Sequence, residues 1–304
     1  MKKKIEFSKF FLPACIISTL CIFVGAFFFI TKGINLSIDF KAGYIEEVEI
    51  KSCPTTEDVR KTLSGFNGVA VKSVGSEDDG FFQVRIGSDK NGSSLLDNIN
   101  AELKNKYSEI NILKTDFIGS QLSKTLGFMS IVLLIGTMIC IWIYAAIRFK
   151  WDFALASIIA LIHDALIMIA AFAIFQVEFS TTSIAAVLTI IGYSINDTVV
   201  ILDRVRDNVQ KLEVKTFKDV IDQSLSDTLS RSIITTVTTM FAVVSLYVFT
   251  TGSIHDFAWA LIIGLISGCY SSLFISSGFI ALVRKNWKPS YGMNPFKPKE
   301  VSVQ

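Results

Sequence analysis

TTSIAAVLTIIGYSINDTVVILDRVRDN, residues 181–208, is the stretch that decides how the whole sequence is interpreted. It begins as an apolar run long enough to enter a bilayer and ends in a polar, basic segment. Asn196 and Asp197 lie within the apolar part. A carboxylate at that depth costs at least about 2.5–3.5 kcal/mol on insertion scales, so something must offset the cost. The stretch therefore predicts a membrane span that carries a functional carboxylate.

The composition places the chain among membrane proteins. It has 304 residues, of which only 18% are charged, and its mean hydropathy is +0.52. The five cysteines show neither a disulfide framework nor a metal-ligand spacing. The sequence also lacks a phosphate-binding loop, a zinc-ligand pattern and a nucleophile elbow. We therefore expect a protein that is not an enzyme and that uses no cofactor, metal ion or nucleic acid.

Six apolar runs are long enough to cross about 30 Å of hydrocarbon. The expected spans are Phe10–Ile30, Gly127–Ile147, Phe153–Phe175, Thr181–Leu202, Ile233–Thr250 and Phe257–Val283. The first is longer than the apolar region of a signal peptide and has no convincing cleavage site, so we expect a retained anchor. In the sixth, Gly264, Gly268 and several serines predict close packing against another helix.

Basic residues orient these spans. Lysines and arginines precede the first span and follow the second, fourth and sixth, whereas the third-to-fourth and fifth-to-sixth connections contain none. The positive-inside rule then places both termini in the cytoplasm. We expect a multi-pass protein with residues 1–9, the connection 203–232 and the tail 284–304 on the cytoplasmic side.

Residues 31–126 form the only expected soluble domain, which is exported. Its pattern predicts strands and helices in the order βαββαβ. The strands are Tyr44–Lys51, Val69–Val74, Phe81–Ile86 and Ile110–Phe117, and the helices are Thr56–Phe66 and Leu95–Tyr107. This order is typical of a small ferredoxin-like sandwich. The predicted fold is therefore an α-helical polytopic membrane protein of six spans with one small α+β ferredoxin-like exported domain.

The cytoplasmic connection after the fourth span has apolar residues at helical spacing. They are Phe217, Val220, Ile221, Leu225 and Leu229. An amphipathic helix on the membrane surface and a solvated connector both fit this pattern.

Three spans carry groups that lipid would not tolerate. Asp164 lies near the midpoint of the third span, next to His163, and Arg231 opens the fifth. Thr228, Arg231, Thr235 and Thr238 share one face of that fifth span. Such groups must face each other or a wet crevice. We predict a proton relay of Asp197, Arg231 and Asp164, supported by the polar side chains of Asn196, Thr235 and Thr238.

Asp197 and Arg231 are expected to pair. The fourth span runs toward the cytoplasm and the fifth runs back, so both residues lie near the cytoplasmic ends of antiparallel neighbours. Separation of the guanidinium from the carboxylate would let Asp197 take up a proton, and their re-approach would expel it. One charge that crosses about 150 mV delivers roughly 3.5 kcal/mol, which could drive movement. The alternative is a static ion pair that fixes helix packing, and for Asp164 the alternative is a fixed hydrogen bond to a neighbouring Ser or Thr.

Several stretches resemble the SecF family, the smaller membrane subunits of the bacterial SecDF protein-export complex. They are ALIHDALIM around Asp164, LTIIGYSINDTVVILDRVRDN around Asp197, TLSRSIITTVTT around Arg231 and SGCYSSLF around Tyr270. SIDFKAG, residues 37–43, resembles the family's Asp-Phe-Thr-Gly-Gly motif, with Lys41 and Ala42 in place of Thr and Gly. The resemblance covers nearly the whole chain.

The resemblance implies membership of the resistance–nodulation–division transporter superfamily. It implies that the chain pairs with SecD, whose spans supply the other half of a pseudo-symmetric unit in the bacterial cytoplasmic (inner) membrane. It also implies association with the SecYEG channel and with YajC, and use of the proton-motive force to draw preproteins across the membrane. Asp197 and Arg231 match, residue for residue, the family's carboxylate and arginine that are implicated in proton transport.

Two other functions compete with a proton-coupled export subunit. A small-molecule exporter of the same superfamily usually carries two large exported domains on a much longer chain, whereas this sequence has one small domain, so the sequence favours the export subunit. A passive scaffold that stabilises the Sec channel without moving protons is equally compatible with the sequence.

Overall fold

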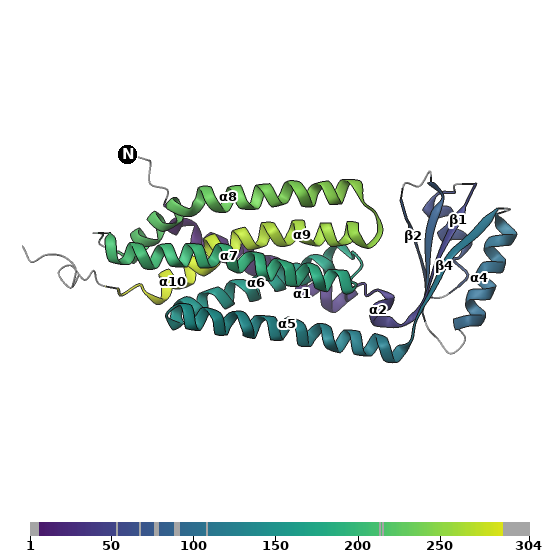
Figure 1. The fold of residues 1–304 in the computed structure, drawn as a ribbon, viewed down its shortest axis with the longest axis horizontal. Coiled ribbons are helices and arrows are strands. Elements are labelled where there is room, and N and C mark those ends of the chain that lie inside the picture. The colour runs from purple at the N-terminus through teal and green to yellow at the C-terminus, as the bar shows by residue number, and fades with distance from the viewer. Residues whose placement is uncertain are drawn as a thin grey trace, which may run out of the picture.

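The computed structural model describes residues 6–52, 54–66, 68–75, 79–87, 92–107, 109–212, 214 and 216–287. A bundle of long helices makes up one end of the molecule, and a small sheet with its helices makes up the other (Figure 1). Residues 1–5 and 288–304 fall outside the described residues, so what we expect of them stays a prediction.

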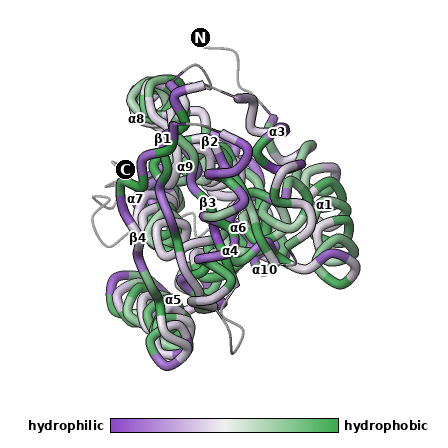
Figure 2. The backbone as a smooth tube through the Cα atoms, turned by 90° about the vertical axis from the view of Figure 1, so that its right-hand side faces the viewer, coloured by the Kyte–Doolittle hydropathy of each residue, from purple (hydrophilic) through white to green (hydrophobic). Residues whose placement is uncertain are grey.

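Six helical segments of the described chain are long and apolar enough to cross a membrane, which confirms the predicted number of spans. They are η1 with α1 (Phe7–Phe10 and Phe11–Lys32), α5 (Ser120–Arg148), α6 (Trp151–Phe175), α7 (Thr181–Lys211), α8 (Phe217–Phe249), and α9 (Gly252–Tyr270) continued by the π-helical turn η3 (Ser271–Ser276) and α10 (Ser277–Val283). Their tubes are mainly in the hydrophobic colour, whereas hydrophilic and hydrophobic colours are mixed along the strands (Figure 2). The long apolar segments of the sequence are thus the helices of the bundle.

Two helices extend further than the sequence predicts. α7 continues to Lys211 and α8 begins at Phe217, so most of the predicted connection 203–232 is helical. Phe217, Val220 and Leu225 are buried, as expected of an amphipathic helix, but they belong to the first half of α8. No Gly or Pro interrupts residues 217–249, so nothing breaks the helical hydrogen bonds. A continuous helix therefore replaces both alternatives, the separate surface helix and the solvated connector.

The interior of the bundle is built mainly by α6, α7 and α9. Leu161, Met168, Ile190 and Ile191 are almost completely buried there, together with Leu265 of α9. Most of α5 is exposed, as are large parts of α1 and α8. These three helices therefore present apolar faces that need lipid or another protein around them.

Close contact between α7 and α9 depends on small residues. A Cβ atom at Gly264 would collide with the Ile190 side chain, and one at Gly268 would lie 3.1 Å from the Cβ atom of Ser194. The predicted packing role of the sixth span is confirmed at these two positions. The approach brings the polar side chains of α7 and α9 within hydrogen-bonding distance of each other.

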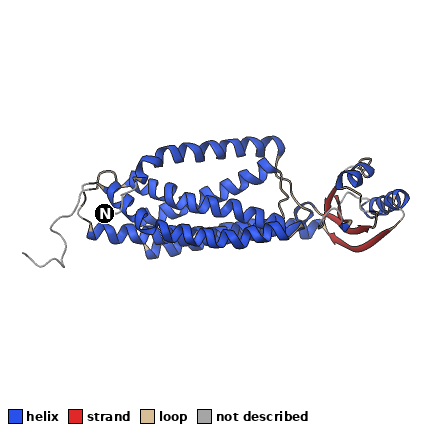
Figure 3. Cartoon of the chain, turned by 90° about the horizontal axis from the view of Figure 1, so that it is seen from above, coloured by secondary structure: helices blue, strands red, loops and turns tan. Residues whose placement is uncertain are grey.

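The part of the chain between the first two spans has the predicted order βαββαβ. Its elements are β1 (Gly43–Ile50), α3 (Thr56–Thr62), β2 (Val69–Ser73), β3 (Phe81–Gly87), α4 (Gly92–Lys106) and β4 (Ile110–Ile118). The strands form one sheet in the order β2-β3-β1-β4, and every neighbouring pair is antiparallel. Both helices lie on one side of the sheet (Figure 3). Val48, Phe82, Ile99 and Leu103 form the core between the two layers.

A short helix joins the two parts of the molecule. α2 (Ile38–Lys41) lies between the end of α1 and the start of β1, at the junction of bundle and sheet (Figure 1). The chain therefore passes from the first span into the sheet through a compact turn rather than a long linker.

Candidate functional site

Asp197 lies in the middle of α7, and only 2% of its surface is exposed. Its Oδ2 atom is buried and has no hydrogen-bond partner among the described residues. Buried carboxylate oxygens are normally hydrogen-bonded, because an unpaired one loses its hydration without compensation. The Asp197 carboxyl group is therefore an exception that requires an explanation.

Two hydroxyl groups of α8 are likewise buried without a hydrogen-bond partner among the described residues. Ser232 and Thr236 are 1% and 9% exposed, and their hydroxyl oxygens are buried without a partner in the described structure. Cys269 of α9 is close to both Asp197 and Thr236. Three of the buried side-chain atoms without a hydrogen-bond partner among the described residues thus belong to Asp197, Ser232 and Thr236. We call these three residues the α7–α8 polar cluster.

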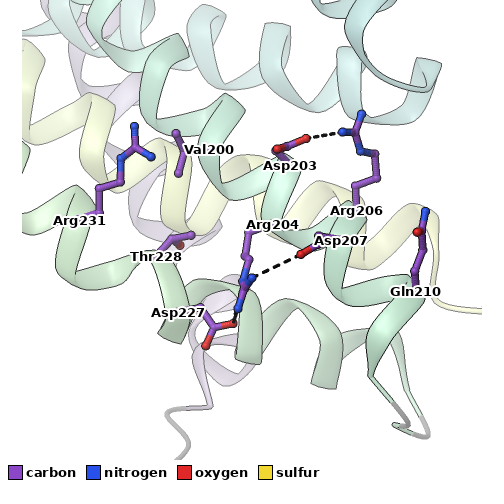
Figure 4. Close-up of a pocket in the computed structure, with 9 residues that line it drawn as sticks. All are labelled: Val200, Asp203, Arg204, Arg206, Asp207, Gln210, Asp227, Thr228 and Arg231. Atoms are coloured by element: carbon purple, nitrogen blue, oxygen red, sulfur yellow. Dashed lines mark hydrogen bonds and ion pairs between the residues drawn. The ribbon is translucent and has the colours of Figure 1, made fainter.

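Arg231 is near Asp197 but is not bonded to it. The guanidinium charge attracts the Asp197 carboxylate, yet no nitrogen–oxygen distance of 4.0 Å or less joins the two in the described chain. Arg231 is exposed, and its side chain extends beside Val200 (Figure 4). The two residues are thus neighbours across α7 and α8, with their charged groups apart.

A polar crevice of about 640 Å³ begins at Arg231 and follows α7 and α8 away from the sheet. It is lined by Val200, Asp203, Arg204, Arg206, Asp207, Gln210, Asp227, Thr228 and Arg231 (Figure 4). Arg204 crosses it, with Nη2 2.6 Å from Oδ2 of Asp227 on α8 and Nη1 3.5 Å from Oδ2 of Asp207. Val200 follows Asp197 by one helical turn, so the inner end of the crevice approaches the α7–α8 polar cluster.

Asp164 has a different environment from Asp197. It is completely buried, and three serine hydroxyls donate to its carboxylate. Ser194 and Ser271 donate to Oδ2 at 2.6 and 2.8 Å, and Ser267 donates to Oδ1 at 2.7 Å. The carboxylate therefore ties α6 to α7, α9 and η3. This supports the alternative of a fixed hydrogen bond, and the relay role of Asp164 stays a prediction.

His163 extends this network to the first span. Its Nδ1 atom is 3.2 Å from Oδ1 of Asp164, and its Nε2 atom is 3.0 Å from the hydroxyl of Ser18. Ser18 in turn donates to the hydroxyl of Tyr270 at 3.1 Å, and Tyr270 donates to the carbonyl of Ala14 at 2.7 Å. The polar side chains of four spans are thus connected through one buried chain of hydrogen bonds.

No hydrogen bond joins the predicted supporting residues to Asp197 in the part of the chain that the structure describes. Asn196 and Thr238 are exposed, and Thr235 is half-buried. The hydroxyls of Thr235 and Thr238 donate to carbonyl oxygens of their own helix, those of Arg231 and Ile234, at 3.0 and 2.8 Å. Their supporting role stays a prediction.

The comparisons with known proteins agree with the sequence motifs. The family model "Protein export membrane protein SecD/SecF, C-terminal" matches residues 98–286. "Protein translocase subunit SecF" of Borreliella burgdorferi is 38% identical over 299 residues, which cover 95% of this chain and 100% of the relative. The chain belongs to the SecF family. Another SecF, from Haemophilus influenzae, is 35% identical over 89% of this chain and 83% of its own length.

Solved SecDF structures share the fold of this SecF-family chain. SecDF from Thermus thermophilus, described as a translocon-associated membrane protein, has a TM-score of 0.80 at 28% identity, and the match covers 93% of this chain and 39% of that one. A SecDF in a super-membrane-facing form has a TM-score of 0.65 at 29% identity over 90% of this chain and 38% of its own. This chain thus spans about two fifths of those solved chains and superposes less closely on the second.

Sequence reasoning missed two serines of the SecF-family site. Ser194 and Ser232 were not identified because a lone serine in an apolar helix usually bonds to its own backbone. Ser267 and Ser271 were interpreted only as packing residues. Their spacing of four places both on one helix face, the face that carries Gly264 and Gly268 toward α7, and that periodicity could have identified them as donors.

Proposed function

We propose that this SecF-family chain is the proton-motive-force-coupled subunit of the Sec protein-export machinery and that it acts with SecD to pull preproteins across the membrane. Asp197 is the proton-carrying group, Arg231 controls it electrostatically, and Asp164 is the remaining relay residue carried over from the sequence. The alternative in the same family is a passive scaffold for the Sec channel.

The observation that carries this proposal is the buried Oδ2 atom of Asp197, which has no hydrogen-bond partner among the described residues, together with the buried and equally unpartnered hydroxyls of Ser232 and Thr236 on α8. A carboxylate that served only to fix helix packing would have its oxygens hydrogen-bonded, as Asp164 does. An ionisable group inside a membrane span, with incomplete partners and a nearby charge of opposite sign, is a candidate for proton exchange.

Arg231 controls when Asp197 releases its proton, and the crevice provides a route for that proton. When the guanidinium approaches Asp197, its charge stabilises the carboxylate and favours release of the proton. When it lies apart, as here, where no ion pair within 4.0 Å joins the two among the described residues, that stabilisation is weaker. Water in the charge-lined crevice of about 640 Å³ provides a route between the α7–α8 polar cluster and the cytoplasm. Movement of α8 relative to α7 would therefore link proton passage to a change in helix packing.

The exposed face of α8 supports pairing with SecD. Arg231 and Thr238 are exposed on a span whose other exposed residues include Ile234 and Phe241. The guanidinium faces the crevice rather than acyl chains, and the exposed polar and apolar residues beside it leave a surface that another protein can cover. We assign that surface to SecD, which would also complete the relay. Association with SecYEG, YajC and preproteins is proposed on the family resemblance.

We further propose that residues 31–126 form a ferredoxin-like domain exported from the cytoplasmic (inner) membrane, with both chain termini in the cytoplasm. The split βαββαβ order and the strand order β2-β3-β1-β4 support the domain assignment. The position of the crevice and of the basic connections at the bundle end away from the sheet supports the orientation.

The test compares Asp197→Asn and Arg231→Ala in vesicles that contain the chain with SecD and the channel. Both variants should co-purify with SecD at the normal level but lose the stimulation of export by a proton gradient. Asp222→Asn is a matched control, since Asp222 is a buried aspartate of α8 whose oxygens are occupied by Ser8 at 2.8 and 2.9 Å. Full gradient-driven export by Asp197→Asn would favour the scaffold.

A further inference from the structure

The segment between α1 and β1 is bonded to the connection between α6 and α7. The N–H of Ser37 donates to the carbonyl of Phe179 at 2.9 Å, and the N–H of Phe179 donates to the carbonyl of Asn35 at 2.8 Å. These bonds form an isolated parallel bridge at Leu36 and Phe179. The chain that leads into the sheet is thus attached two residues before α7 begins.

Asp39 extends this attachment to α7 itself. Its Oδ2 atom accepts hydrogen bonds from the N–H and from the hydroxyl of Thr181, both at 2.9 Å. Thr181 is the first residue of α7, where backbone N–H groups have no partner within the helix and a negative charge is favourable. Asp39 therefore caps α7 from a different part of the chain.

The same segment fits tightly against the sheet. Ala42 has a left-handed backbone with φ of +62°, and a side chain at Gly43 would collide with the carbonyl of Ile86 in β3. The N–H of Asp39 also donates to the hydroxyl of Ser37 at 3.1 Å. α2 therefore has little freedom to move relative to β1 and β3, and a displacement of Asp39 is passed on to the sheet.

Two ion pairs attach the sheet to the same end of the bundle. Arg85 of β3 pairs with Glu178, which precedes α7, and both side chains are 14% exposed. Lys72 of β2 lies 2.5 Å from Asp256 near the start of α9. Burial lowers the pKa of Arg85 below its ordinary value. The nearby negative charge of Asp256 opposes that effect, because it favours the charged guanidinium. The sheet is thereby seated on the first turns of α7 and α9.

α7 connects this attachment to the α7–α8 polar cluster. The helix is continuous from Thr181 to Lys211, and Asp197 follows Thr181 by 16 residues. At 1.5 Å per residue, the two positions are about 24 Å apart along the axis. A rigid helix passes an axial shift from one end to the other. A movement of α7 at Asp197 would therefore move the helix end that Asp39 holds.

We propose that Asp39 is a positioning residue that couples the exported domain to proton-linked movement of α7, with the Arg85–Glu178 pair as a second attachment. This inference rests on the proposed function of Asp197. The aspartate of SIDFKAG then has a mechanical role. Movement of α7 displaces Asp39 through its hydrogen bonds to Thr181, and Asp39 passes this displacement to the exported domain.

The test uses Asp39→Ala and Asp39→Asn in the chain assembled with SecD and the channel in vesicles. Proton entry is followed with a pH-sensitive dye, and gradient-driven completion of preprotein export is measured in the same preparation. Asp39→Ala removes the acceptor, so gradient stimulation of export should fall by about 5- to 150-fold, the usual range of coupling, while proton entry continues. Asp39→Asn keeps an acceptor oxygen and should retain most of the stimulation.

Asp58→Ala is the matched control, because Asp58 also caps a helix, α3, but does so within the exported domain through Thr55. It should leave both measurements unchanged. The proposal is overturned if Asp39→Ala keeps full gradient-driven export, if it loses export and proton entry together, or if Asp58→Ala is equally defective. Failure of the proposed function gives a different result, in which Asp197→Asn itself exports at the normal gradient-driven rate.

Discussion

Asp164 and Asp197 are 0% and 2% exposed in adjacent spans of one bundle, yet their partners differ. Three serine hydroxyls donate to Asp164, whereas Oδ2 of Asp197 has no donor among the described residues. Burial alone therefore does not distinguish an aspartate that fixes helix packing from one that is available for proton exchange. The hydrogen-bond partners make that distinction.

Asp164→Ala should destabilise the bundle. The substitution leaves three serine hydroxyls without an acceptor between α6, α7 and α9, and it should lower the free energy of unfolding by roughly 2–4 kcal/mol. Thermal unfolding of the purified chain in detergent measures the effect. Ser157→Ala is the control, because that hydroxyl donates to a carbonyl of its own helix at 2.8 Å. Equal unfolding temperatures for Asp164→Ala and the wild type would contradict a packing role.

Asp58 makes a pH-dependent contribution to the stability of α3 in the domain that contains the sheet. The Thr55 hydroxyl and backbone N–H donate to its carboxylate and lower its pKa below the ordinary value. Because the pKa is lower in the folded state, the ionised carboxylate stabilises the fold at pH values above the unfolded pKa of about 3.9. This stabilisation is lost as the pH falls through the folded pKa. Asp58→Asn should therefore weaken hydrogen-exchange protection of α3 at pH 7 and match the wild type near pH 2. An equal loss of protection at both pH values would refute this linkage.

At the scale of residues, the sequence predicts which groups are exceptional but not where they point. An acid inside an apolar run is visible without a structure, and so is an arginine at the start of the next span. Which hydroxyls face Asp197 depends on the rotation of α8. Arg231 and Thr238 of the expected stripe are exposed and Thr235 is half-buried. Thr228 of the same stripe is buried, as are Ser232 and Thr236.

The contact between α7 and α9 sets the geometry of the site at the scale of elements. Because a Cβ atom at Gly264 would collide with Ile190, the helices approach closely only when this position has no side chain. The same approach lets Ser194 of α7 and Ser267 of α9 reach the carboxylate of α6. The polar network around the α6 carboxylate therefore depends on the close spacing of α7 and α9.

Gly264→Val should separate α7 from α9. Overpacking of this kind costs about 1–3 kcal/mol in free energy of unfolding, and it should also reduce gradient-driven export, because Ser194 and Ser267 move apart. Gly192→Ala is the control, since Gly192 lies on α7, the partner helix of α9, and nothing lies within 4 Å of a Cβ atom placed there. Thermal unfolding in detergent and the export assay check both effects. Normal stability of Gly264→Val would show that the two helices are not in close contact.

The elements themselves were largely predictable. Hydropathy predicted six spans and alternation predicted βαββαβ, because both patterns are local in sequence. The extension of α7 and α8 beyond the apolar runs was not predicted, since hydropathy reports apolar length rather than helix length. The cap from Asp39 to Thr181 was also not predictable, because it joins residues 142 positions apart.

At the scale of the molecule, some helices of the bundle are covered by their neighbours and others are exposed. α6 and α9 are mostly buried, whereas α5 and α8 expose apolar residues such as Phe128 and Phe241 together with Arg231. The sheet is attached at one end, and the crevice opens toward the other (Figure 1). This asymmetry fits a subunit that needs a partner along α8 and acts on opposite sides of a membrane.

The orientation can be tested by labelling. In a cysteine-free background, Asp116→Cys in β4 should react with an impermeant maleimide added to intact cells treated only to open the outer membrane. Lys211→Cys at the end of α7 should react only after the inner membrane is permeabilised. Lys211 is exposed and the Asp116 side chain is 47% exposed, so lack of access within the fold does not limit labelling. Labelling of Lys211→Cys in intact cells would contradict a cytoplasmic position for the crevice.

The central claim is that Asp197 converts a proton gradient into export, and the rate at which a trapped preprotein completes its passage tests it most directly. The measurement is made in inverted vesicles after ATP has been exhausted, with and without an imposed gradient. The account predicts that the gradient accelerates completion with the wild-type chain and has no effect with a normally assembled Asp197→Asn chain. Equal acceleration of the two would contradict it.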